Sequence, residues 1–117
     1  MKAYTDIEQS KKLAEFLPIE SADMYWIHVQ GFNDWWKVET IQGSFRPFSM
    51  NIRCWSLAAL LGVLPEGIIK NYYVPNLQKE NGKYSIAYGN DELLCIADNP
   101  VDACYELITL LHKENLI

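Results

Sequence analysis

The sequence is poor in the residues that build metal centres. It has two histidines and three cysteines, and none of them has the close spacing of a zinc site such as CxxC or HxxxH. We therefore expect no metal and no other cofactor. The cysteines, Cys54, Cys95 and Cys104, are odd in number and widely spaced, unlike the disulfide framework of a small secreted domain. They are interpreted as reduced thiols in the core.

Phosphate-binding loops and long apolar runs are also missing. The six glycines are scattered without GxGxxG or GxxxxGK spacing. The longest apolar run, residues 54–65, is interrupted by Ser56 and Gly62 and is too short to span a bilayer. The first eight residues lack the apolar stretch of a secretory signal. We expect a cytoplasmic protein without a membrane partner.

Positive charge is scarce in the last quarter of the chain. Residues 1–89 carry nine acids and nine bases, whereas residues 90–117 carry six acids against Lys113 alone, so the net charge of −5 lies there. A surface that repels phosphates is unsuited to general nucleic-acid binding, and no nucleic-acid partner is expected. We interpret the acids as a solvated helix face, and docking of a basic protein is the alternative.

The composition is that of a folded domain, because half of the 117 residues are apolar and 13% are aromatic. The length fits a single globular domain, residues 1–117. The clearest element is a helix that starts after Asn99, a good N-cap, with Pro100 in the first position and Asp102 in the first turn. One face is predicted to pack on a β-sheet, because apolar residues recur at spacings of three and four. These residues are Val101, Cys104, Tyr105, Ile108 and Leu111.

Two further helices are predicted. The first is capped by Thr5 with Glu8 three residues later and ends before Pro18. The second follows Asn51 as its cap, runs through residues 54–61 and ends at Gly62. The residues of this second helix are apolar on almost every side, so it should be buried in the domain or against a partner.

Strands are predicted where aromatic and β-branched residues alternate with polar ones. Residues 24–29 and 35–41 are predicted to form a hairpin, and residues 42–51 a loop. Three short strands at 68–74, 83–88 and 92–97 form a meander with turns at residues 81–82 and 89–91, and Pro75 marks an edge or an end. The predicted fold class is α+β, a single-domain antiparallel sheet of about five strands with three helices packed mainly on one face.

Large aromatic residues gather between residues 25 and 55. Trp35 and Trp36 cannot both point inward from one regular strand, so one of them should be exposed or lie in a loop. An exposed tryptophan is typical of an interface anchor, and the alternative is a local packed cluster. The candidate interface, for a protein partner or for self-association, consists of Phe32, Trp35, Trp36, Phe45 and Phe48.

A lesser candidate is an anion or thiol site at the start of the second helix. It comprises Arg46, Arg53 and Cys54, since a helix N-terminus favours anions and lowers the pKa of a thiol. A buried structural cysteine is the commoner role in such an apolar helix.

Three segments carry a resemblance to known proteins. They are residues 10–26, which contain Ser10-Lys11-Lys12-Leu13-Ala14-Glu15-Phe16-Leu17-Pro18 and Ala22-Asp23-Met24-Tyr25-Trp26, then Trp55 to Pro65, and Asp98 to Glu106 with Leu111-His112. Together they resemble a family of small uncharacterised bacterial proteins associated with prophage-like and mobile elements. The resemblance implies an accessory cytoplasmic or phage-related role and supplies no activity, cofactor or catalytic residue.

We expect from the sequence a non-enzymatic accessory or protein-interaction domain, because no catalytic constellation is recognisable and the aromatic segment fits an interface. The alternative is a small-molecule-binding protein or a minor hydrolase with a pocket near Cys54.

Overall fold

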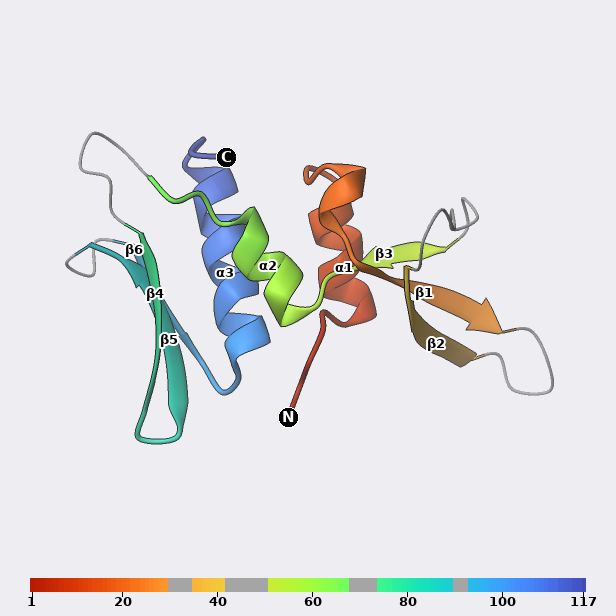
Figure 1. The fold of residues 1–117 in the computed structure, drawn as a ribbon, viewed down its shortest axis with the longest axis horizontal. Helices are drawn as coiled ribbons and strands as arrows, with labels where there is room; N and C mark the ends of the chain where they lie inside the picture. Colours follow the sequence, from red (N-terminus) through yellow and green to blue (C-terminus); the bar gives the residue numbers. More distant parts are fainter. Residues whose placement is uncertain (30–34, 42–50, 68–73, 90–92) are drawn as a thin grey trace.

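The structure, a computed structural model, describes residues 1–29, 35–41, 51–67, 74–89 and 93–117. In Figure 1, two sheets lie at opposite ends of an elongated molecule, and the helices lie between them. The principal extents are 50 × 30 × 25 Å. The described elements are α1 (Ile7–Ala14), the 3-10 helix η1 (Ile19–Ser21), β1 (Met24–Val29), β2 (Trp35–Thr40), β3 (Ile52–Cys54), α2 (Leu57–Val63), β4 (Pro75–Glu80), β5 (Lys83–Tyr88), β6 (Leu93–Ala97) and α3 (Pro100–Lys113).

The fold is α+β, as predicted, but the sheet arrangement differs from the prediction. The described strands form two three-stranded antiparallel sheets, β2-β1-β3 and β4-β5-β6, instead of one sheet of about five strands. The helices lie between the two sheets and do not share one face of a single sheet (Figure 1). The central strands β1 and β5 each pair on both edges with strands of their own sheet. Among the described strands, no ladder of backbone hydrogen bonds joins the two sheets.

Helix α3 follows the prediction closely. The Asn99 side chain accepts a hydrogen bond from the Asp102 backbone N–H at 2.8 Å, and Pro100 begins the helix. One side of α3 packs on β5 and β6, and another packs on α2. Tyr105 is only half-buried, whereas Leu107, which was outside the predicted face, is fully buried because the helix is covered on two sides. The fully buried residues of α3 are Val101, Ala103, Cys104, Leu107, Ile108 and Leu111.

The β4-β5-β6 sheet directs one face toward α3. Leu77, Ile86 and Cys95 lie opposite one another across the three strands, and Ile86 is fully buried. The turn at Asn81-Gly82 is confirmed, with positive φ at both residues (53° and 75°), as a two-residue hairpin turn requires. Strand β4 lies outside the predicted segments, and residues 68–73, predicted as a strand, lie outside the described residues.

Helix α1 starts one residue later than predicted. Its N-cap is Asp6, whose carboxylate accepts from the Gln9 N–H at 2.8 Å, while the Gln9 side chain accepts from the Asp6 N–H at 3.1 Å. The predicted cap, Thr5, is instead fully buried, and its hydroxyl is 2.8 Å from the Ser10 hydroxyl. The capping box was therefore placed at the wrong pair of residues.

The second predicted helix was also misplaced. Residues 52–54 form β3 and pair with β1, so a strand and not a helix follows Asn51. Helix α2 begins after Ser56, whose hydroxyl accepts from the Ala59 N–H at 3.2 Å. Gly62 lies inside α2, which ends at Val63. A short apolar run is compatible with a strand or a helix. In residues 52–54, pairing with β1 favours the strand.

The two halves share one hydrophobic cluster. Leu13 of α1, Trp55, Leu60 of α2 and Ile86 of β5 are all fully buried in it. A polar tie at the N-terminus of α3 reinforces this junction, because the Asp102 carboxylate accepts hydrogen bonds of 2.8 Å each from the side chains of Lys2, Gln9 and Asn99. The core is therefore continuous from α1 to the β4-β5-β6 sheet.

Candidate functional site

The tryptophan pair of the predicted interface lies on β2, and Phe32, Phe45 and Phe48 lie outside the described residues. Trp35 is 51% exposed. Trp36 is half-buried and directly opposite His28, with the ring centroids 4.9 Å apart. The prediction that one of the two tryptophans is exposed is confirmed, because alternation along β2 sends them to opposite faces.

The predicted thiol site is not formed as expected. Cys54 is fully buried on a strand, not at a helix N-terminus, and its sulfur lies 3.5 Å from Thr5 Oγ1 and 3.4 Å from the Thr5 carbonyl oxygen. Burial raises the pKa of the Cys54 thiol, and it raises that of Cys104 to about 12. Such thiols stay protonated and shielded, which does not favour nucleophilic chemistry.

Arg53 lies beside a hollow of about 330 Å³ between α1 and β3. Its guanidinium donates to the Ile19 carbonyl at 3.3 Å. The two charged side chains of the lining, Lys11 and Arg53, are both cations above an apolar floor. The complete lining is Lys11, Ala14, Leu17, Ile19, Asn51, Ile52, Arg53 and Trp55. Arg46, the other predicted anion ligand, lies outside the described residues.

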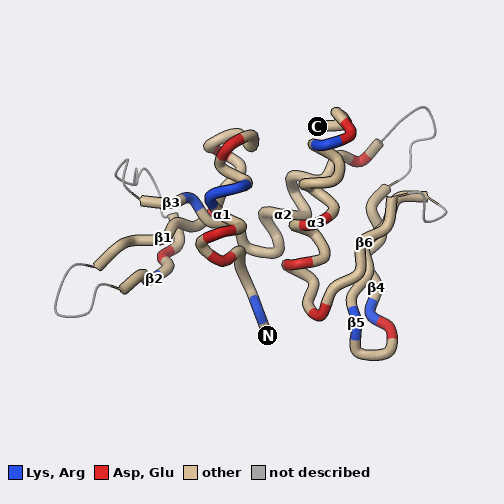
Figure 2. Tube along the Cα trace, turned by 180° about the vertical axis from the view of Figure 1, so that it is seen from behind, with Lys and Arg blue, Asp and Glu red and all other residues tan. Residues whose placement is uncertain are grey.

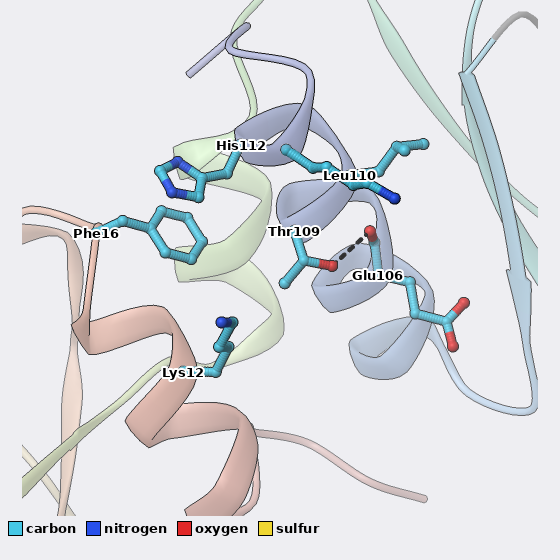
Figure 3. A pocket seen from close by; sticks show the side chains of 7 residues that line it. Lys12, Phe16, Glu106, Thr109, Leu110 and His112 are labelled. Atoms are coloured by element: carbon cyan, nitrogen blue, oxygen red, sulfur yellow. Dashed lines mark hydrogen bonds between the residues drawn. The ribbon is translucent and has the colours of Figure 1, made fainter.

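A second hollow, of about 440 Å³, opens between α1 and the C-terminal half of α3. Figure 3 shows the rings of Phe16 and His112 facing each other there, stacked at 3.9 Å with 7° between their planes. The Thr109 hydroxyl is engaged, since it donates to the Glu106 carbonyl at 2.9 Å, and the Glu106 carboxylate points away from the two rings (Figure 3). The polar groups do not converge, and the ring stack links α1 to α3. Lys12, Leu110 and Lys113 complete the lining.

The largest of these hollows, about 580 Å³, lies between α2 and the segment around η1. It is lined by Pro18, Glu20, Ser21, Ala22, Asp23, Ala58, Ala59, Gly62 and Val63. A Cβ atom added to Gly62 would meet nothing within 4 Å, so the hollow is open at this point of the helix. The charged residues of this lining, Glu20 and Asp23, are both acids.

Helix α2 is far less buried than its sequence predicts. Within its seven residues only Leu60 is buried, whereas Ala58, Leu61 and Gly62 are exposed, Leu61 by 38%. Figure 2 shows α2 as a helix without charged residues between the charged helices α1 and α3. Among the described residues, one side of this all-apolar helix is therefore covered and the other side is exposed.

The walls of the α2 hollow are held by hydrogen bonds. The Asp23 carboxylate accepts from the Ser56 N–H at 2.9 Å and also from the Ser56 hydroxyl, so it fixes the residue that caps α2. On the other wall, Trp55 Nε1 donates to the Ser21 hydroxyl at 3.0 Å, which in turn donates to the Pro18 carbonyl at 2.6 Å. The shape of this hollow is thus set within the folded chain. Sequence reasoning missed the η1 wall, although Ala58 and Gly62, four residues apart on one helix face, mark the opposite one.

Within the described ranges, no group of three or more His, Cys, Asp or Glu side chains is placed to hold a metal ion. No helix in the described part of the chain combines the length and apolar character needed to cross a bilayer. Neither a protein-family model, nor a curated protein, nor a solved structure matches the chain.

Proposed function

We propose that this chain is an accessory protein-interaction domain without chemistry of its own, and that α2 and the η1 segment form its docking surface. The observation that carries the proposal is the exposed side of α2. A helix that is apolar all round is normally covered, by its own domain or by a partner. Here Ala58 and Gly62 are exposed and line a formed hollow, and Leu61 is exposed on the same helix. Exposed apolar residues beside a hollow are typical of an interaction site.

The chemistry of the surface identifies the class of partner. Ala58 and Gly62 have small side chains at i and i+4, which lets the backbone of another helix approach closely. The rim carries Glu20 and Asp23 without a balancing cation in the lining. We therefore propose an amphipathic helix of a partner protein, with an apolar face flanked by lysine or arginine.

The resemblance to bacterial proteins of prophage-like and mobile elements supports an accessory role of this kind. Membership of that family and a cytoplasmic location are part of the same proposal. A docking surface that needs no cofactor fits such a role.

The test is a titration of the full chain with a designed helical peptide of about 18 residues, five turns of helix. Its apolar face carries leucine and alanine, its flanks carry lysine, and a matched peptide carries glutamate at those flanks. We expect the lysine peptide to bind at least about tenfold more tightly at low salt, because it meets the acidic rim. Amide chemical shifts should change at Ser21, Ala58 and Gly62. Equal affinity of the two peptides, or shifts confined to other surfaces, refutes the proposal.

Two variants at one position separate docking from folding. Gly62→Arg fills the hollow and adds a cation, so it should weaken binding of the lysine peptide by about tenfold or more. Gly62→Ala adds one methyl group in open space and should bind within about threefold of wild type. Both variants replace glycine by a better helix former, so neither should lose stability. Unchanged binding by Gly62→Arg contradicts the assigned surface.

A small-molecule-binding role is the second candidate, and the hollow beside Arg53 is the observation that favours it. Lys11 and Arg53 above an apolar floor suit an organic anion with an aromatic or aliphatic body. Calorimetric titration with 1-naphthoate tests this role. We expect binding that is lost in Arg53→Gln and retained in Lys113→Gln, whose cation lies at the other hollow. The absence of binding by wild type removes the candidate.

A further inference from the structure

The outer edge of β2 has backbone groups that point away from β1. Among the described strands, β2 is an edge of the β2-β1-β3 sheet. The Ile41 N–H donates to the Asp23 carbonyl at 3.0 Å, in register with the β1–β2 ladder. Odd-numbered residues of β2 therefore direct their backbone groups toward β1, and Trp36 and Val38 direct theirs outward. Such an edge is a template for another strand.

The side chains along this edge alternate in a defined order. Trp35, Lys37, Glu39 and Ile41 share one face, so an aromatic residue is followed by a cation, an anion and an aliphatic residue. The side chains of Lys37 and Glu39 are 44% and 47% exposed, and their charged atoms are 3.3 Å apart. Trp35 is the most exposed aromatic residue of the described ranges.

We propose that the chain forms a homodimer in which β2 pairs antiparallel with β2 of a second copy, centred on Val38. In this register Lys37 lies opposite Glu39 of the second copy, and the two-fold symmetry makes this contact twice. Trp35 lies opposite Ile41 of the second copy, also twice, which covers the exposed indole with a β-branched side chain. The backbone groups of Val38 exchange hydrogen bonds with those of the other Val38.

The charges of Lys37 and Glu39 favour this register over the neighbouring ones. They also favour a second copy of β2 as the strand that pairs with this edge. A shift of two residues in one direction places Lys37 opposite Lys37, and the opposite shift places Glu39 opposite Glu39. Like charges directly opposite each other destabilise a strand pair. A shift of one residue turns the outward hydrogen-bonding groups away from their partners. The register centred on Val38 is the one with two attractive charge pairs and the full length of residues 35–41 in contact. The pairs of Lys37 with Glu39 and of Trp35 with Ile41 are non-hydrogen-bonded pairs, in which cross-strand side chains approach most closely.

The β2 edge shares no residue with the α2 surface, so pairing of two β2 strands and docking of a helix at α2 are independent of each other.

Sedimentation velocity of the full chain and of two charge-reversal variants tests the proposal. Wild type should show a dimer that dissociates on dilution. Lys37→Glu and Glu39→Lys each place like charges at both cross-strand contacts, so each should weaken dimerisation at least about tenfold. An equimolar mixture of the two variants should recover a dimer, because glutamate of one variant then lies opposite lysine of the other at both contacts.

The mixture distinguishes a dimer contact from an effect on folding. The internal pair of residues 37 and 39 is lost in both variants and stays lost when they are mixed, so recovery requires contact between chains. A wild type that stays monomeric up to about 100 μM, the upper range of weak specific pairs, overturns the proposal. So does a mixture no more dimeric than the separate variants.

A proline substitution gives a second, independent measurement. The Val38 N–H points away from β1, so Val38→Pro should keep the β1–β2 ladder while removing the central hydrogen bonds between the copies. We expect a monomer with the circular dichroism spectrum of wild type. A dimer of unchanged affinity in Val38→Pro refutes edge pairing. Gly62→Arg, which blocks the α2 surface, should dimerise like wild type, so failure of either proposal is recognised separately.

Discussion

The two sheets have the same number of strands and the same antiparallel pairing, but they differ in how they are covered. In β4-β5-β6, the central strand ends in three buried residues, Ile86, Ala87 and Tyr88, and α3 packs against the face that carries Ile86 and Tyr88. In β2-β1-β3, the central strand has one buried residue, Tyr25, and the others are half-buried. Strand number alone therefore does not determine how well a sheet is anchored, because burial depends on what packs against it.

The first sheet is held by directed contacts at one corner. Trp26 Nε1 donates to the Thr5 carbonyl at 3.2 Å, and the Trp26 ring meets Tyr4 edge to face at 5.6 Å. Helix α1 reaches this sheet near β3, where Thr5 and Cys54 are buried. We infer that β2-β1-β3 opens more readily than β4-β5-β6, and that an exposed edge is retained there because the core does not depend on it.

The largest effect should come from charging the helix that anchors the second sheet. Ile108→Asp buries a carboxylate among apolar side chains without a partner, and we expect a loss of about 4 kcal/mol or more, enough to unfold most of the protein. Thermal denaturation followed by circular dichroism measures it. Glu106→Asp, on the exposed side of α3, is the control and should melt near the wild-type temperature. A cooperative wild-type transition in Ile108→Asp contradicts the assigned core.

The same isoleucine-to-alanine substitution in each central strand compares how much the two sheets contribute to the free energy of unfolding. Ile86→Ala in β5 should cost about 2–5 kcal/mol, because the residue is fully buried and leaves a cavity. Ile27→Ala in β1, where the residue is half-buried, should cost about 1 kcal/mol. Urea unfolding of both variants gives the two values. Equal losses of unfolding free energy in the two variants would mean that the two sheets are equally well anchored.

The smallest of these effects concerns the polar tie between the halves and depends on pH. Partial burial alone raises the pKa of Asp102, but the hydrogen bonds from Lys2, Gln9 and Asn99 outweigh it, and the pKa lies below the ordinary value of 3.8. A lowered pKa contributes stability that is complete above the unfolded value and is lost as the pH falls through the folded one.

Asp102→Asn should therefore lower the free energy of unfolding by about 1 kcal/mol at pH 7, since the carboxylate is partly exposed. The difference from wild type should shrink as the pH falls below the ordinary pKa of 3.8 and through the lower pKa of the folded state. Urea unfolding across this range measures it. Asp98→Asn is the control, because the Asp98 side chain is 80% exposed and its pair with Lys83 should contribute little. A difference for Asp102→Asn that stays constant with pH contradicts the role of its charge.

Local signals in the sequence predicted the elements that depend on local interactions. Asn99 and Pro100 define the start of α3 within one turn, and Asn81-Gly82 defines a hairpin through two positive φ angles. The cap of α1 was misplaced because Thr5 and Asp6 are both good caps, and contacts with distant residues take Thr5 into the core.

The pairing of strands that are distant in the sequence could not be predicted from such local signals. Residues 52–54 became a strand because β1 offers them an edge, which no periodicity in so short a segment specifies. Adjacent residues of a strand point to opposite faces of the sheet, so the sequence could predict that Trp35 and Trp36 face opposite ways and that one of them is exposed. The α2 hollow was not predictable, because its second wall comes from η1, a segment far away in the chain.

The Thr5–Trp55 contact has a consequence for the order in which the chain folds. Strands β4, β5 and β6 and helix α3 follow one another in sequence, so their contacts close short loops and form quickly. The Thr5 N–H instead donates to the Trp55 carbonyl at 2.9 Å, and the neighbouring Tyr4 and Ser56 form a β-bridge, which joins points almost half the chain apart. Closing that loop carries the larger entropic cost. The N-terminal residues are therefore expected to join last, after the C-terminal half has formed.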